Sequence, residues 1–227
     1  MPELGIVAAL PKEAAMWRAG RADEPVWRIR VGGVGARCAA EAAQALLHDG
    51  ARALLCWGVA GGLQSHLAPG AIFVADRVAD PGGVEPVDAD ACSRLLDVLR
   101  EAGLPIVSGG LWSSPHAVTE VSAKRELALA GWAAVDMESA AVARVARMAG
   151  VPFAAIRAIS DPAERALPSA ATHLLRPDGR VRVMALLALL LRGPEAWRAL
   201  GGMRRDFAAA CAGLRQVSGV VPLSWTA

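Results

Sequence analysis

The sequence predicts an α/β fold of three layers, in which a central, mostly parallel, mixed sheet has helices on both faces. Short apolar runs alternate with helical patterns along the chain, which is typical of this class. The apolar runs, such as Leu4–Leu10 and Phe153–Ile159, are nearly continuous, as expected of strands buried on both faces. With 227 residues, the chain is long enough to bury a whole sheet between two helical layers.

The first half of the chain supplies four of the predicted strands. We expect strands at residues 4–10, 26–31, 53–57 and 71–78, a helix at 11–18, and an alanine-rich helix from Gly35 to His48. Pro11 favours a helix start, because its fixed φ suits the first helical position. Residues 80–90 are rich in Pro and Gly, and we expect there a loop that could act as a lid or a partner contact.

The second half continues the alternation. We expect helices at 91–102 and 122–130 around a strand at 104–111. The stretch Val135-Asp136-Met137-Glu138-Ser139 then leads into a helix that ends at Gly150. The strand Phe153–Ile159 follows and ends in Ser160-Asp161-Pro162, so that a helix start and a strand end each present an acid.

Composition and charge exclude several classes of protein. The formal net charge is only +2, whereas a nucleic-acid partner usually needs a clustered basic surface. The four cysteines are scattered without CxxC spacing, so the sequence predicts neither a metal site nor a disulfide framework. The N-terminus shows no charged segment followed by a cleavage site, and we expect a cytoplasmic protein.

A glycine run at Gly32-Gly33-Val34-Gly35 raises the question of a dinucleotide site. The third position of that fingerprint is Cys38 rather than glycine, and the next strand ends in Cys56-Trp57-Gly58 without the expected acid. We therefore reject a nicotinamide site, while a close backbone approach to a phosphate or a ribose stays open.

Three acids are expected at the carboxyl ends of the strands, the edge of the sheet where ligands bind in open α/β folds. Glu138 precedes a helix, Asp161 ends a strand, and Glu13 lies in the first turn of a helix. For Glu13 alone, a surface acid favoured by the helix dipole is the preferred interpretation. Two carboxylates in different surroundings suit the cleavage of a sugar–base bond, in which one holds the sugar and the other protonates the leaving group.

The chain resembles the nucleoside phosphorylase / 5'-methylthioadenosine–S-adenosylhomocysteine nucleosidase superfamily. The residues that carry the resemblance are Gly5–Ala9 with Glu13, Gly58–Leu63, Asp136–Glu138 and Arg157–Asp161, in the family's order. Asp161–Pro168 and Leu175–Val181 are similar to the hopanoid-associated branch, whose members are proposed to remove adenine from adenosylhopane, a lipid nucleoside.

The resemblance implies a role for each site residue. Asp161 would be the general acid that protonates purine N7, and Glu13 would orient or deprotonate the attacking water. The implied substrate-binding residues are Glu138 on the ribose hydroxyls, Met137 against the sugar, Arg157 and Ser160 beside the acid, main-chain groups near Val118 at the adenine edge, and Val59 and Gly61 in the glycine-rich stretch. Val59 stands where the nucleosidases usually carry Ser or Thr.

The resemblance leaves the nucleophile open. The phosphorylases carry an arginine-bearing phosphate loop after the first strand, whereas this chain has Leu10-Pro11-Lys12-Glu13, where an acid repels phosphate and suits water activation. This favours hydrolysis without metal or organic cofactor; phosphorolysis, with phosphate as co-substrate, is the alternative because of Lys12. The same residues are also compatible with a soluble methylthioadenosine/adenosylhomocysteine nucleosidase and with a non-catalytic nucleoside- or lipid-binding protein.

The sequence divides into a catalytic domain at 1–178 and a helical C-terminal extension at 179–227. Residues 180–217 combine seven arginines and two acids with an apolar stripe that includes Trp197, Leu200, Met203, Phe207 and Leu214. Such a pattern is used by interfacial helices on anionic lipid. We expect the extension to pack on the catalytic domain and to contact either a membrane surface or another subunit of a homo-oligomer.

Overall fold

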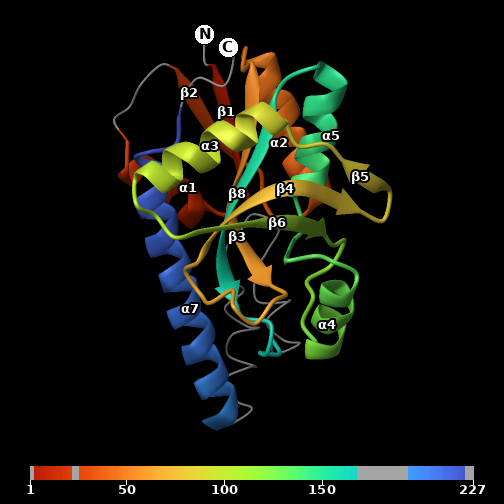
Figure 1. Cartoon of the computed structure of the whole chain (residues 1–227), viewed down its shortest axis with the longest axis vertical. Coiled ribbons are helices and arrows are strands. Elements are labelled where there is room, and N and C mark those ends of the chain that lie inside the picture. Colours follow the sequence, from red (N-terminus) through yellow and green to blue (C-terminus); the bar gives the residue numbers. More distant parts are fainter. Residues whose placement is uncertain (1–2, 22–25, 168–193, 223–227) are drawn as a thin grey trace.

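The computed structural model describes residues 3–21, 26–167 and 194–222. Eight strands within these ranges form one mixed sheet (Figure 1). They are β1 (Leu4–Ala8), β2 (Trp27–Val31), β3 (Ala53–Gly62), β4 (Ile72–Asp80), β5 (Gly83–Glu85), β6 (Ile106–Ser113), β7 (Ala134–Asp136) and β8 (Phe153–Asp161). The helices are α1 (Pro11–Ala19), α2 (Ala36–His48), α3 (Ala89–Glu101), α4 (Val121–Leu129), α5 (Ser139–Ala149) and α7 (Pro194–Ser218).

The sheet is mostly parallel and partly closed. The strand order is β2-β1-β3-β7-β6-β4-β5, and β8 pairs in parallel with β3 and antiparallel with β4. The strands β3, β7, β6, β4 and β8 therefore form a ring. Because β1, β3 and β8 are parallel, their carboxyl ends meet at one edge of the sheet, and this edge is where ligands bind in such folds.

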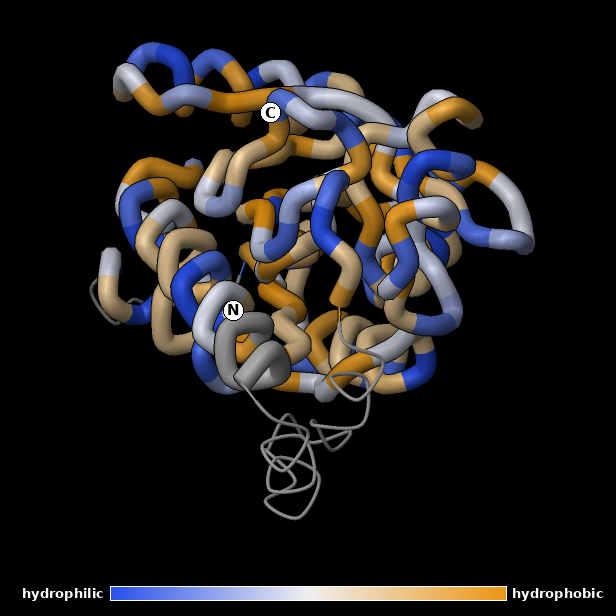
Figure 2. The backbone as a smooth tube through the Cα atoms, turned by 90° about the horizontal axis from the view of Figure 1, so that it is seen from below, coloured by the Kyte–Doolittle hydropathy of each residue, from blue (hydrophilic) through white to orange (hydrophobic). Residues whose placement is uncertain are grey.

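Two apolar cores confirm the predicted three layers. Alternate strand residues face opposite sides of the sheet: Leu4 and Ile6 of β1 pack toward α1, α3 and α7, whereas Val7 packs toward α2 and α5. A view from below shows hydrophobic and hydrophilic stretches alternating along the chain, with hydrophobic segments passing through the interior (Figure 2). Three tryptophans, Trp17, Trp27 and Trp57, stack edge to face in the first core.

Most predicted elements are confirmed with ends shifted by a few residues, and three differences matter. The third predicted strand, 53–57, continues through the glycines to Gly62, because β8 pairs with it along that whole length. The predicted loop at 80–90 contains the short strand β5, which pairs with β4 as a hairpin. The strand β7 has only three residues, too few for a periodic pattern to reveal.

The helix α7 accounts for the described part of the C-terminal extension. Its buried residues Ala210, Leu214 and Val217 follow helical spacing and belong to the first core, so this half of the helix packs as a core helix beside α1 (Figure 1). Of the predicted stripe, Leu200, Met203 and Phe207 are half-buried. Residues 179–193 lie outside the described residues. No helix in the described ranges is long and apolar enough to cross a membrane.

Candidate active site

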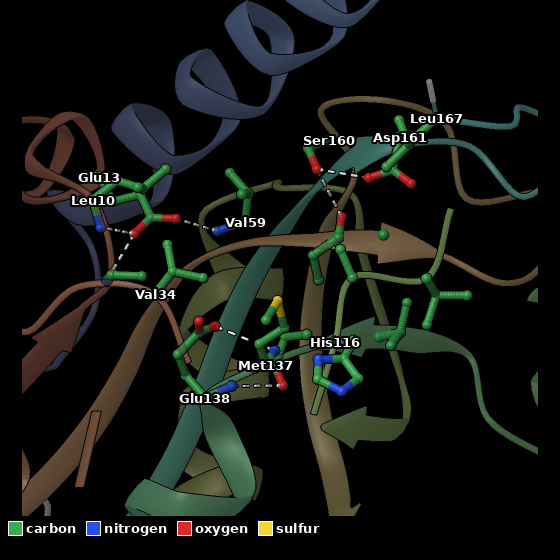
Figure 3. A pocket seen from close by; sticks show the side chains of 17 residues that line it. Leu10, Glu13, Val34, Val59, His116, Met137, Glu138, Ser160, Asp161 and Leu167 are labelled. Atoms are coloured by element: carbon green, nitrogen blue, oxygen red, sulfur yellow. Dashed lines mark hydrogen bonds between the residues drawn. The ribbon is translucent and has the colours of Figure 1, made fainter. Parts of the chain in front are cut away.

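A pocket of about 230 Å³ opens where β1, β3, β7 and β8 end (Figure 3). Its volume is just below the roughly 300–1,000 Å³ of typical small-molecule sites, which suits one small ligand. Glu13 and Glu138 lie on one side of the pocket, and Ser160 and Asp161 on the other. The lining residues are Ala9, Leu10, Glu13, Val34, Val59, Ala60, Gly61, His116, Ala117, Val118, Val135, Asp136, Met137, Glu138, Ser160, Asp161 and Leu167.

Glu13 is a buried acid held in place by main-chain donors, and the alternative of a solvated surface acid is wrong. Its position in the first turn of α1 lets Oε2 accept from the N–H groups of Ala9 (2.9 Å) and Leu10 (2.8 Å), the second of which is the N-cap. Oε1 accepts from the Val59 N–H at 3.0 Å. Burial raises the pKa of Glu13, while the positive charge of Arg157 and these hydrogen bonds lower it.

Glu138 approaches the same space from the N-terminus of α5. Its Oε1 accepts from the Gly35 N–H at 2.8 Å. Gly35 has a φ of 101°, a conformation that glycine adopts without strain, so the glycine run serves the carboxylate here. Burial and the neighbouring Asp136 carboxylate raise the pKa of Glu138 to about 7, against the positive charge of Arg157.

Behind these acids lies a buried ionic cluster that sequence reasoning did not assign. Asp136 accepts from the Ser113 hydroxyl (2.5 Å) and from the Ser139 N–H (3.1 Å) at the start of α5, and it also forms an ion pair with Arg157. The Ser139 hydroxyl lies 2.9 Å from Arg157 Nη2. Asp136 therefore orients the helix that carries Glu138.

The placement of Arg157 differs from the prediction that it contacts the substrate beside Asp161. Its side chain is 1% exposed and is not among the residues that line the pocket. Position along the strand explains this, because Arg157 is four residues before Asp161 on β8 and lies deeper in the sheet, opposite Gly58 of β3. Its guanidinium compensates the charges of Asp136 and Glu138, the latter at 3.9 Å.

The raised pKa of Glu138 predicts a pH-dependent stability. In the folded state the Glu138 carboxyl keeps its proton up to about pH 7, whereas the reference pKa is 4.5. The stabilisation that comes from binding this proton is fully present below about pH 4.5 and is lost as the pH rises through 7. Gln cannot lose a proton, so Glu138→Gln should gain relative stability between pH 5 and pH 8, by about 3 kcal/mol. Urea unfolding at the two pH values measures this.

The matched control for this prediction is Glu41→Gln, which removes the same charge from an exposed position on α2. Its stability relative to the unchanged protein should differ little between pH 5 and pH 8, since an exposed i,i+4 ion pair contributes about 0.3–0.5 kcal/mol. The same pH response in Glu138→Gln and Glu41→Gln would contradict the interpretation.

Asp161 faces the acids from the other side of the pocket. It is the last residue of β8 and pairs in register with Gly61 of β3. A Cβ on Gly61 would lie 3.0 Å from Asp161 Oδ2, so the glycine makes room for the carboxylate. The Ser160 hydroxyl donates to Asp161 Oδ1 at 2.9 Å, and the ammonium of Lys124 on α4 donates to Oδ2 at 2.5 Å.

The remaining predicted residues also surround the pocket. Val59, Gly61, Met137, Ser160 and Val118 are all among its lining residues. His116, an exposed loop residue, lines it as well (Figure 3). Sequence reasoning missed Val34, Leu167 and the support from Lys124 and Asp136. The spacing within Asp136-Met137-Glu138 was visible, but only the fold shows which carboxylate faces the pocket.

The described residues contain no group of three or more His, Cys, Asp or Glu side chains that could hold a metal ion. The lining residues offer a ligand carboxylates, a hydroxyl, an imidazole and main-chain groups. Such a set can bind hydroxyl groups, donate a proton and accept one.

Comparisons with known proteins agree with this arrangement. The family model described as the phosphorylase superfamily matches residues 8–192. No curated protein sequence matches the chain. Among solved structures, it is similar to a 5'-methylthioadenosine/S-adenosylhomocysteine nucleosidase from Neisseria meningitidis in complex with methylthio-immucillin-A, at 18% identity and a TM-score of 0.71, covering 97% of this chain and 99% of that one.

A second similar structure is the futalosine hydrolase of Helicobacter pylori, with 16% identity and a TM-score of 0.68 over 95% of this chain and 97% of that one. At these identities the structures establish the shared fold, and the family model, which spans most of the chain, establishes the relationship. The chain therefore belongs to the phosphorylase superfamily, whose nucleosidases and nucleoside phosphorylases cleave the N-glycosidic bond of purine nucleosides.

Proposed function

We propose that this protein hydrolyses the N-glycosidic bond of a 5'-substituted adenosine and releases adenine. The observation that carries the proposal is one small pocket with carboxylates in two different environments. Glu13 and Glu138 share a buried cluster in which burial raises the pKa of both, whereas Asp161 is fixed across the pocket by a hydroxyl and an ammonium group. Two such environments allow a proton acceptor and a proton donor to act in one reaction.

In the proposed mechanism, Asp161 first takes up a proton from solvent on Oδ1 while Lys124 still donates to Oδ2. It then gives this proton to N7 of adenine as the bond between C1' and N9 breaks, so that the base leaves neutral. The sugar develops oxocarbenium character, which the nearby carboxylates stabilise electrostatically. Glu138 accepts hydrogen bonds from the ribose hydroxyls. Water adds to C1' and gives its proton to Glu13, whose raised pKa makes it a better base than an exposed glutamate.

Water is favoured over phosphate as the nucleophile by the charges around the pocket. No lysine or arginine is among the described residues that line it, whereas Glu13, Asp136, Glu138 and Asp161 are. Lys12, the residue that favours phosphorolysis, is exposed and does not line the pocket. A phosphate dianion beside Glu13 would be repelled, since like charges at close range are unfavourable.

Adenosylhopane is the proposed substrate, and its support is the sequence similarity to the hopanoid-associated branch together with the apolar side chains Leu10, Val118 and Leu167 at the pocket. The alternative substrates are methylthioadenosine and adenosylhomocysteine. Adenine release should be measured for all three in phosphate-free buffer and again with added phosphate. A kcat/KM that is largest for adenosylhopane without phosphate supports the proposal; strict dependence on phosphate would make the protein a phosphorylase.

The exposed arginines of α7 lead us to propose contact with an anionic membrane surface. Arg204 and Arg205 are both exposed on this helix, and each such residue near anionic lipid contributes about 1 kcal/mol. Replacing both with Glu should therefore weaken co-sedimentation with phosphatidylglycerol vesicles at least tenfold. Arg52→Glu with Arg100→Glu, at exposed positions elsewhere, is the control. Equal binding by the two double variants would leave homo-oligomer contact as the proposal for α7.

A further inference from the structure

A buried lysine on α4 holds the segment that carries the proposed general acid. Lys124 is 1% exposed, although it lies on a helix whose other residues are exposed or half-buried. Its ammonium donates to Asp161 Oδ2 at 2.5 Å, to the Pro162 carbonyl at 2.8 Å and to the Arg165 carbonyl at 3.2 Å. An ammonium group has three protons, so all of its donors are used.

A buried ammonium is costly unless it is paired and hydrogen-bonded, and an apolar residue could fill the same space without that cost. Contact with this part of the chain does not by itself require a charge, because the Leu167 N–H donates to the carbonyl of Thr119, just before α4, at 2.9 Å. Among the residues that the structure describes, the counter-ion of this charge is the carboxylate of Asp161, whose other oxygen accepts from Ser160.

We propose that Lys124 is a positioning residue for the leaving-group acid. This inference rests on the proposed function. Lys124 fixes the rotamer of Asp161 by donating to Oδ2. The other oxygen, Oδ1, then accepts from Ser160, and both residues line the pocket. The same ammonium ties the acid to residues 162–165 and to α4, the helix that follows the pocket residues His116, Ala117 and Val118. The side chain of Lys124 thus sets the position of Asp161 and of the residues before α4 that lie at the proposed adenine site.

The inference is tested by comparing two leaving groups on one sugar. Adenine needs a proton to leave, whereas 4-nitrophenolate leaves without one. Lys124→Met removes the ammonium but retains a long side chain. It should lower kcat for adenine release from methylthioadenosine by about 100-fold, with KM within about threefold, because a misplaced acid acts on the transition state. Cleavage of the 4-nitrophenyl glycoside of 5-methylthioribose should change by less than about threefold.

Arg125→Met is the matched control, since it removes the charge of the neighbouring, exposed residue on α4. It should leave both rates unchanged. Lys124→Arg keeps a buried cation, but its longer side chain displaces Asp161. It should therefore lose adenine release while it still cleaves the 4-nitrophenyl glycoside, and it replaces Lys124→Met in the test if that variant does not fold.

Equal loss on both glycosides in a folded Lys124 variant would overturn the inference, because a purely structural role affects both leaving groups alike. Unchanged adenine release would overturn it as well. The unsubstituted protein separates this failure from that of the proposed function: if it releases adenine from none of adenosylhopane, methylthioadenosine and adenosylhomocysteine, the proposed function is wrong, whatever the variants do.

Discussion

Asp161→Asn is expected to lower kcat for adenine release by about 10²–10⁴-fold, the usual contribution of general acid catalysis. Asn keeps the shape of the side chain but cannot give a proton to the leaving base. The same variant should cleave the 4-nitrophenyl glycoside at a nearly unchanged rate, because that leaving group needs no proton. Initial rates on both glycosides, with KM determined for each, measure the effect.

Stability must be followed in the same experiment, because Lys124 is buried and loses its counter-ion in Asp161→Asn. Leaving a buried charge unpaired costs about 3–5 kcal/mol, so a lower Tm is expected and the assays should be run well below it. Asp97→Asn, at an exposed ion pair on α3, is the control and should match the unsubstituted protein. Adenine release by folded Asp161→Asn within about threefold of normal would contradict the assigned role.

Gly58→Ala is expected to abolish most of the activity through Glu13. A Cβ at this position would lie 2.5 Å from Glu13 Oε1 and 2.8 Å from Arg157 Nη1, closer than such atoms approach. Glu13 cannot yield easily, since three main-chain N–H groups hold its carboxylate. We expect kcat to fall by about 10²–10⁴-fold as the carboxylate leaves its place, and stability to fall by about 1–3 kcal/mol.

The control for this substitution is Gly201→Ala on α7, where an added Cβ meets no atom within 4 Å. Ala stabilises a helix interior relative to Gly by about 0.5–1 kcal/mol, so this variant should be fully active and at least as stable. Steady-state kinetics and urea unfolding of both variants complete the comparison. An active Gly58→Ala enzyme would show that the position of Glu13 does not matter for turnover.

Much of the sheet could be predicted because each strand carries its own local signal. The run Phe153–Ile159 was apolar and was followed by Ser160-Asp161-Pro162, so both β8 and the place of Asp161 at its end were visible. Gly150 likewise marked the end of α5, where it adopts the left-handed conformation at the C-cap. In β8 and α5 the local sequence favours the same secondary structure that the fold contains.

Pairing between distant segments could not be predicted in the same way. The ring closes because β8 pairs with both β3 and β4, and no local pattern specifies two partners. Arg157 appeared as a polar residue near a binding motif, but it is a buried counter-ion because its strand position lies below the pocket. Lys124 looked like an ordinary helical lysine, since only the packing of α4 against the end of β8 removes it from solvent.

A single-turnover experiment tests the central claim most directly. Enzyme in excess over methylthioadenosine is mixed in phosphate-free buffer, and adenine is measured by chromatography over time. Excess enzyme removes product release and repeated turnover from the observed rate, so the measurement concerns whether this pocket breaks the bond of the bound nucleoside. We predict complete conversion to adenine and free methylthioribose in a single exponential. Bound substrate that stays intact over many hours, with and without added phosphate, would contradict the account and indicate a protein that only binds nucleosides.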